Sequence, residues 1–144
     1  MWSENKRKKA ALRKAERRIR VIKKFAGASI WSADLNNLLP FYRDMLGLKV
    51  VNESPGFVVL GADQPDAPAL GLGTHSEVHG RNSDPARHMI GLESDDLAAD
   101  WKRLKKAGID FIEDPTEYGS DMSIATLKDP EGNLVQLWQY RGEG

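Results

Sequence analysis

The clearest strand pattern in the chain lies near its end, in residues 134–139. Val135 and Leu137 alternate with Gln136 and Trp138, which is the two-residue period of a strand whose two faces differ. One face is predicted to pack on helices. The other is predicted to line a cleft that accepts a glutamine and a tryptophan.

A tight turn is predicted just before this strand, in the segment Asp129–Asn133 (Asp-Pro-Glu-Gly-Asn). Pro130 presets its own φ, and Gly132 and Asn133 tolerate left-handed backbone, so the segment favours a chain reversal. Residues 122–128 also have a strand pattern, and we therefore predict a C-terminal hairpin.

Upstream, the pattern predicts strands at 21–31, 49–53, 57–62 and 69–74. A helix is expected after the first of them, capped by Ser32 or Asp34 and ended by Gly47, with Pro40 making its first turns irregular. Its apolar stripe comprises Leu35, Leu38, Tyr42, Met45 and Leu46.

The same order of elements restarts after a polar, turn-rich linker. A strand at 88–94, a helix at 95–107 ended by Gly108 and a strand at 109–113 precede the hairpin. Leu97, Trp101 and Leu104 form the core stripe of this helix. Ala33-Asp34-Leu35 and Asp95-Asp96-Leu97 hold equivalent places between strand and helix, which indicates an internal repeat.

We therefore predict an α+β fold of two βαβββ modules of about 55 residues each, forming a curled mixed sheet around a cleft. Module one spans about 21–75, the linker 76–86 and module two 87–140. A basic helical extension covers residues 1–20, and the domain proper covers 21–144.

Charge is distributed unevenly along the 144 residues, although 21 basic and 21 acidic side chains cancel overall. Residues 1–24 carry 11 of the bases and two acids, a net charge of +9, which leaves the remainder at −9. Residues 6–18 are strong helix formers with a thin apolar stripe. A solvated or loosely docked helix is the favoured interpretation.

Binding of this helix to nucleic acid or an anionic membrane is not expected, because a Lys/Arg cluster without interleaved aromatic residues is weakly specific. An engineered appendage is a further alternative. The chain has no run of roughly 18 apolar residues that would indicate a membrane span, and we expect no secretory signal. Without cysteine there is no disulfide or thiolate site, and a cytoplasmic location is expected.

Three motifs together are similar to those of one known family: Phe41–Leu48 (FYRDMLGL), Ala107–Phe111 (AGIDF) and Asp129–Asn133 (DPEGN). In this order and spacing, they resemble the vicinal oxygen chelate superfamily, the glyoxalase/bleomycin-resistance/extradiol-dioxygenase group. The resemblance covers about Val21 to Tyr140. It implies paired βαβββ modules around a shared cleft, and it leaves a homodimer open as an alternative to a monomer.

In metalloenzymes of that family, His or Gln on the first strand of a module and Glu on its last strand hold a divalent metal that chelates two substrate oxygens. The matching positions here are Gly27, Met89 and Gln136, with Ala69, Gly71 and Gly73 on the last strand of module one. Glycine and alanine offer no donor, and thioether sulfur is a poor ligand for hard ions. The resemblance therefore predicts no metal site and no cofactor.

Other candidate groups are few. His75, Glu77 and His79 lie in one loop with no helix to align them, so a metal site is disfavoured and His75 is expected at the cleft rim. Glu93 shares the cleft-facing parity of Met89 and is the candidate catalytic residue, as a general base. A solvated residue at the end of a strand is the simpler interpretation of Glu93.

The predicted cleft combines glycines that leave room, tryptophans that supply flat walls and a few polar groups. Its expected ligand-binding residues are Ser29, Trp31, His75, Met89, Glu93, Gln136 and Trp138, with Gly27, Gly71, Gly73, Gly91 and Leu134 beside them. This favours metal-independent binding of a small, partly aromatic molecule. In the opposing interpretation, the two tryptophans merely fill the fold.

Two further functions stay open. One is a glyoxalase-like lyase, isomerase or dioxygenase with a displaced metal site or with acid–base chemistry through Glu93. The other is an inactive or engineered scaffold.

Overall fold

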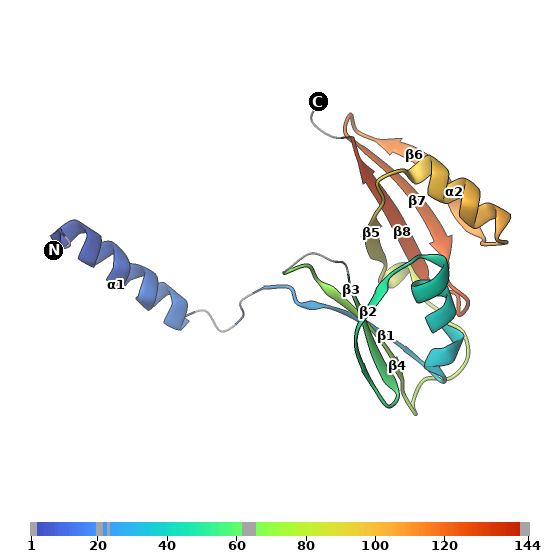
Figure 1. The fold of residues 1–144 in the computed structure, drawn as a ribbon, viewed down its shortest axis with the longest axis horizontal. Helices are drawn as coiled ribbons and strands as arrows, with labels where there is room; N and C mark the ends of the chain where they lie inside the picture. The colour runs from blue at the N-terminus through green and yellow to red at the C-terminus, as the bar shows by residue number, and fades with distance from the viewer. Residues whose placement is uncertain (1–2, 20–21, 23, 62–65, 142–144) are drawn as a thin grey trace.

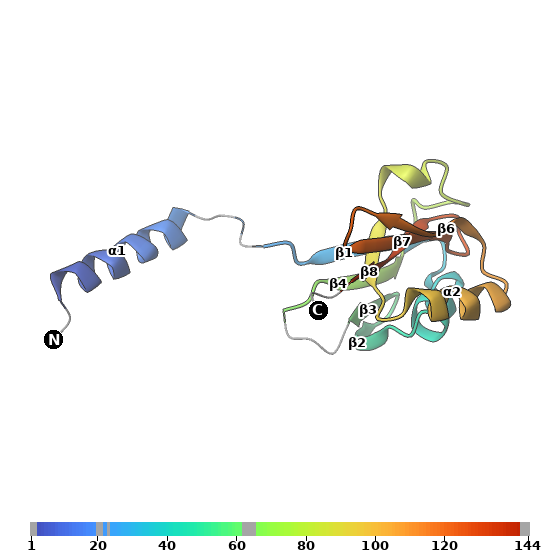
Figure 2. The same cartoon turned by 90° about the horizontal axis from the view of Figure 1, so that it is seen from above.

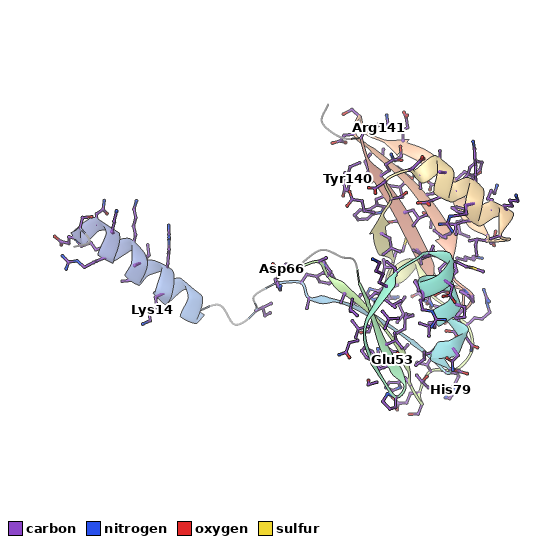
Figure 3. The ribbon with its side chains drawn as sticks, viewed as in Figure 1. Lys14, Glu53, Asp66, His79, Tyr140 and Arg141 are labelled. Carbon is purple, nitrogen blue, oxygen red and sulfur yellow. The ribbon has the colours of Figure 1, made fainter. Side chains whose placement is uncertain are left out.

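The computed structural model describes residues 3–19, 22, 24–61 and 66–141. Helix α1 (Glu4–Ile19) stands away from the two sheets in both views of the fold (Figure 1 and Figure 2). Figure 3 shows Lys14 of α1 well apart from Glu53 and His79. The predicted basic helix is therefore present and projects from the rest of the molecule.

Module one is a βαβββ unit built around a four-stranded sheet. Its strands are β1 (Gly27–Ser32), β2 (Lys49–Ser54), β3 (Phe57–Gly61) and β4 (Ala69–Thr74), in the spatial order β1-β4-β3-β2. β1 runs parallel to β4, and the other pairs are antiparallel. The connection from β1 to β2 carries the 3₁₀ turn η1 (Leu35–Asn37) and the π-helix η2 (Pro40–Met45).

Module two repeats this plan after the 3₁₀ turn η3 (Pro85–Arg87). Its elements are β5 (Ile90–Glu93), α2 (Leu97–Lys106), β6 (Phe111–Tyr118), β7 (Met122–Lys128) and β8 (Leu134–Tyr140). The sheet order β5-β8-β7-β6, with β5 parallel to β8, matches that of module one. The predicted α+β fold of two βαβββ modules is confirmed.

The repeat extends to the hydrogen bonds that start each helix. Asp34 Oδ1 accepts from the backbone N–H of Asn36 at 3.0 Å, and Asp96 Oδ1 accepts from that of Ala99 at 3.1 Å. These caps satisfy backbone donors that the first helical turn leaves unpaired. The predicted equivalence of the two Asp-Leu pairs is therefore visible in the structure.

The first helix differs from the expected regular one. The sequence predicted irregular first turns at Pro40, and η2 begins there. The helix ends just before Gly47, which has a φ of +80°. Its wider π turn, seen in the bond from Leu46 N–H to the Phe41 carbonyl, shifts the buried face away from a 3.6-residue period. Phe41 is consequently buried, whereas Met45 is 38% exposed and its predicted core position is wrong.

The hydrophobic core is shared by both modules. Leu38, Phe41 and Tyr42 of module one belong to the same buried cluster as Leu104 and Val135 of module two. In β8, Val135 and Leu137 face this core as predicted. Trp101 does not belong to it.

Trp101 is half-buried, and its core assignment is wrong. Its Nε1 donates to Asp114 at 2.9 Å, and Lys105 Nζ lies 5.0 Å from its ring centroid. An indole N–H needs a hydrogen-bond partner, and the surface supplies one here.

Several strand bounds differ from the prediction because the partner strand decides them. β1 starts at Gly27, opposite the start of β4 at Ala69, and the described residues 22 and 24–26 are not in a strand. β5 starts at Ile90, opposite Val135, which leaves His88 and Met89 outside it. Residues 20, 21, 23 and 62–65 lie outside the described part, as do the side chains of residues 15–19.

The strand β6 is longer than predicted and contains Pro115. Proline is tolerated there because β6 lies at the edge of its sheet and its register shifts between Glu113 and Thr116. Among the described residues, no helix combines the length and the apolar character needed to cross a bilayer.

Candidate functional site

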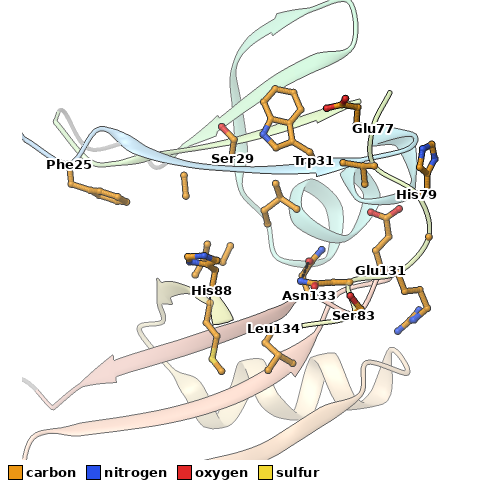
Figure 4. Close-up of a pocket in the computed structure, with 18 residues that line it drawn as sticks. Phe25, Ser29, Trp31, Glu77, His79, Ser83, His88, Glu131, Asn133 and Leu134 are labelled. Carbon is orange, nitrogen blue, oxygen red and sulfur yellow. Dashed lines mark hydrogen bonds between the residues drawn. The ribbon is translucent and has the colours of Figure 1, made fainter. Parts of the chain in front are cut away.

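A cavity of about 670 Å³ lies between the two modules. β1 and β5 each lie at one edge of their sheet, and the cavity is bordered by both, by the loop 77–83 and by the turn before β8 (Figure 4). Phe25, Ile30, Met89 and Leu134 supply apolar surface. Polar lining comes from Ser29, Glu77, His79, Arg81, Asn82, Ser83, His88, Glu131 and Asn133.

A second cavity of about 320 Å³ shares Phe25, Ala28, Met89 and Ile90 with the first. Its remaining lining is formed by Pro68, Ala69, Leu70, Gly91, Leu92 and Trp138. No charged side chain is among them. A polar cavity and an apolar one therefore lie next to each other between the modules.

The cleft glycines do not leave open room, contrary to the sequence-based prediction. A Cβ atom on Gly73 would lie 2.3 Å from the Trp31 ring, and one on Gly91 would lie 2.7 Å from the Trp138 ring. Real Cβ atoms do not approach so closely, so each tryptophan ring lies over a glycine. The glycines accommodate the protein's own aromatic rings.

Trp31 belongs to a small aromatic group at the rim of the larger cavity. Its ring centroid lies 5.4 Å from that of Phe57 and 5.6 Å from that of His75, which it meets edge-on. Trp31 is 43% exposed. In Figure 4, Trp31 and Ser29 project from the side of β1 opposite to Phe25. The Trp31 ring therefore lies on the face of β1 that points away from Phe25, where it is only partly covered.

The structure separates the seven predicted ligand-binding residues. Ser29, Trp31 and Met89 line the larger cavity, and Met89 and Trp138 line the smaller one. The other three, His75, Glu93 and Gln136, line neither. Their ligand-binding roles remain predictions.

Each of these three residues has a defined setting. His75 Nδ1 accepts from the Glu77 backbone N–H at 3.1 Å, and Gln136 Oε1 accepts from Trp138 Nε1 at 3.2 Å. Glu93 is exposed, and its side chain makes no hydrogen bond or ion pair with any residue that the structure describes. A general base must reach its substrate, and Glu93 lies outside both cavities.

The turn Asp129–Asn133 has a structural role that the sequence did not predict. Asp129 is 3% exposed, and its Oδ1 accepts from the backbone N–H groups of Glu131 and Asn133. Its Oδ2 accepts from Tyr42 Oη at 2.7 Å and from Asn133 Nδ2 at 2.7 Å. Burial, together with the negative charge of Asp129 and this hydrogen bond, raises the pKa of Tyr42 far above its usual value.

Other contacts bind the same turn to the linker and to β1. Ser32 is fully buried, and its Oγ donates to Glu131 Oε1 at 2.7 Å. Arg81 Nη1 donates to the Pro130 carbonyl at 2.9 Å, and Asn82 Nδ2 donates to Asn133 Oδ1 at 2.8 Å. The turn therefore holds one wall of the larger cavity in place.

Comparison with known proteins gives a family match over residues 24–137, to the glyoxalase/bleomycin resistance protein/dioxygenase superfamily. The chain belongs to the glyoxalase/bleomycin resistance protein/dioxygenase superfamily. The resemblance carried by the three sequence motifs is thereby confirmed.

Three known proteins illustrate the similarity, each at low sequence identity. The uncharacterized protein YurT of Bacillus subtilis (strain 168) is 26% identical over 126 residues, covering 81% of this chain and 98% of YurT. The superfamily protein from Nocardioides has a TM-score of 0.62 at 17% identity, with 94% and 95% of the two chains covered. Virulence protein STM3117 from Salmonella typhimurium has a TM-score of 0.65 at 20% identity, with 84% and 99% covered. These structural likenesses show the shared fold.

The residues present do not fit the divalent metal of the superfamily's metalloenzymes. A Cβ on Gly27 would lie 2.0 Å from the Ala69 carbonyl oxygen, so no ligating side chain can stand there. Met89 offers a thioether, and the oxygen of Gln136 already accepts from Trp138. Among the described residues, no three His, Cys, Asp or Glu side chains converge as metal ligands.

Several residues that line the cavities were not predicted from the sequence as site residues. Phe25 is 72% exposed beside both cavities, although it was expected inside a strand. Alternation along the predicted strand 88–94 would put His88 and Met89 on opposite faces, but both line the larger cavity because β5 begins only at Ile90. Alternation along the chain predicted which face a residue occupies only within the strand itself.

Proposed function

We propose that this superfamily member binds a small, partly aromatic molecule between β1 and β5, without a metal ion. The observation that carries the proposal is the cavity of about 670 Å³ lined by Phe25, Met89 and Leu134, with Trp31 on the bordering strand β1. Its size is that of ordinary small-molecule sites, in which apolar and aromatic surface supplies most of the binding. Trp138 extends this surface in the adjoining cavity.

The donor chemistry supports a metal-independent role. Gly27, Met89 and Gln136 together cannot supply the carboxylate and imidazole ligands that hold a hard divalent ion. Binding of a ligand through shape, stacking and hydrogen bonds needs none of them.

The alternative of acid–base catalysis through Glu93 lacks geometric support, because Glu93 borders neither cavity. The proposed role is therefore capture of the ligand, with no bond broken.

Tryptophan fluorescence tests the proposal directly. A panel of planar aromatic compounds should quench the emission of the protein with saturation. Quenching should shrink in Trp31→Phe and Trp138→Phe, whereas Trp101→Phe, which removes an indole outside both cavities, should retain it. Emission that stays unquenched across the panel would overturn the proposal.

A further inference from the structure

We propose that the two cavities form one elongated site for an amphiphile, in which an aromatic or other apolar group is joined to an uncharged, hydrogen-bonding head group. This inference rests on the proposed function and specifies the class of ligand. It follows from what lines each end of the site.

The smaller cavity is the apolar end. Pro68, Leu70 and Leu92 line it, and Trp138 closes it with a ring that lies over Gly91. No side chain there carries a formal charge. A polar group placed at this end would lose its hydration without gaining a partner, which is costly. An apolar ring or chain would instead gain contact with every wall.

The larger cavity is the polar end. Glu77, His79, Ser83 and His88 line it, and within the described residues none of their side chains forms a hydrogen bond or ion pair with the protein. By contrast, Asn82 and Asn133 bind each other. The cavity therefore presents several free donors and acceptors to a head group.

The two cavities adjoin, because Phe25, Ala28, Met89 and Ile90 border both. Phe25 is 72% exposed and Met89 is 40% exposed, so both offer apolar surface at the junction. A single ligand can thus lie along the boundary between β1 and β5 and touch both ends.

The charges at the polar end favour an uncharged head. Glu77 and Glu131 are negative and Arg81 is positive, so the attraction of an anionic or a cationic head to one of these groups is opposed by repulsion from another. Arg81 also donates to the Pro130 carbonyl, and Glu131 accepts from Ser32. A neutral polyhydroxyl or amide head can bond to these groups without that repulsion.

Equilibrium dialysis with three naphthalene probes tests the inference. Naphthyl glucoside carries a neutral hydrogen-bonding head, methoxynaphthalene lacks one and naphthyl sulfate is anionic. The glucoside should bind about tenfold more tightly than methoxynaphthalene, as two or three net hydrogen bonds imply, and more tightly than the sulfate.

Variants assign the two ends. The double variant His79→Ala/His88→Ala should reduce the preference for glucoside over methoxynaphthalene to about threefold or less, while leaving methoxynaphthalene binding unchanged. Phe25→Ala should weaken both probes alike. Lys102→Ala, an exposed change on α2 outside both cavities, is the control and should alter neither.

The outcomes separate the two proposals. If methoxynaphthalene or naphthyl sulfate binds as tightly as the glucoside, or if the histidine variant keeps the full preference, the amphiphile inference is wrong and aromatic binding stands. If no probe binds, the proposed function itself fails and the inference fails with it.

Discussion

Tyr42 donates a 2.7 Å hydrogen bond to Asp129 across 87 residues of sequence, and both side chains are buried. The bond joins η2 of module one to the turn that precedes β8 of module two. It is therefore a polar link between the modules inside their shared core.

Removing the Tyr42 hydroxyl should weaken this link. We expect Tyr42→Phe to lower the free energy of unfolding by about 1–3 kcal/mol, because the buried Asp129 carboxylate loses one of its donors. Urea denaturation followed by circular dichroism measures the change.

Tyr118→Phe is the matched control. Tyr118 also donates to a carboxylate, that of Glu113, but Tyr118 is 43% exposed and Glu113 is only partly buried. Water replaces the lost partner there, so stability should hardly change. Equal losses in the two variants would contradict a special role for the buried pair.

The raised pKa of Tyr42 predicts a stability loss at high pH. The folded chain keeps this phenol neutral, whereas the unfolded chain ionises it above a pH of about 10. The stabilisation is thus complete below that pH and is lost as the pH rises, by about 1.4 kcal/mol per pH unit. Urea denaturation between about pH 9 and pH 12 should show this extra slope in the wild type and not in Tyr42→Phe. If the free energy of unfolding falls equally with pH in the wild type and in Tyr42→Phe, the loss does not come from Tyr42.

Gly91 should tolerate no side chain, because Trp138 covers it. In Gly91→Ala the new methyl group would meet the indole at 2.7 Å. Overpacking of this kind lowers the free energy of unfolding by about 1–3 kcal/mol and should also shift the tryptophan emission as the ring moves. Gly61→Ala adds a methyl group that meets Val51 at an ordinary 3.4 Å, and we expect little effect. Similar behaviour of both variants would show that the indole does not lie over Gly91.

Metal content should be substoichiometric in the purified protein. Because the three family positions offer no adequate donor set, elemental analysis for Fe, Mn, Ni and Zn should find well under one ion per chain. Dialysis against a chelator should leave melting and ligand binding unchanged. One tightly held ion per chain would overturn the metal-independent proposal.

Deletion of residues 1–19 should leave the domain intact. α1 stands away from the sheets, and Leu12 of its apolar stripe is 62% exposed. We expect the same melting temperature and the same probe affinity as in the full chain. A clear drop in melting temperature would instead reveal that α1 docks on the domain.

The elements that sequence predicted best are those whose pattern is local. β7 and β4 occupy the predicted residues 122–128 and 69–74, because turn residues flank each strand. The start of β1 could not be found this way. It depends on where β4 begins, some forty residues farther along the chain.

The candidate site was predictable in part for the same reason. Alternation placed Gln136 and Trp138 on the face of β8 away from the core, and the structure agrees. It could not show that the Trp138 ring would lie over Gly91, because that depends on a rotamer and on a neighbouring strand. Nor could it bring Phe25 and His88, which lie outside regular strands, to one cavity.

The bond between Tyr42 and Asp129 uses the two halves of the duplicated fold differently, because module one supplies the hydroxyl and module two supplies the carboxylate. Tyr42 and Leu104 stand at the same distance along the chain from their capping residues Asp34 and Asp96, so the repeat position that supplies a hydroxyl in one half supplies a hydrocarbon in the other. A protein built from two copies of module two would place a leucine, rather than a tyrosine, opposite each buried carboxylate. The two halves share one backbone plan, but they are not interchangeable.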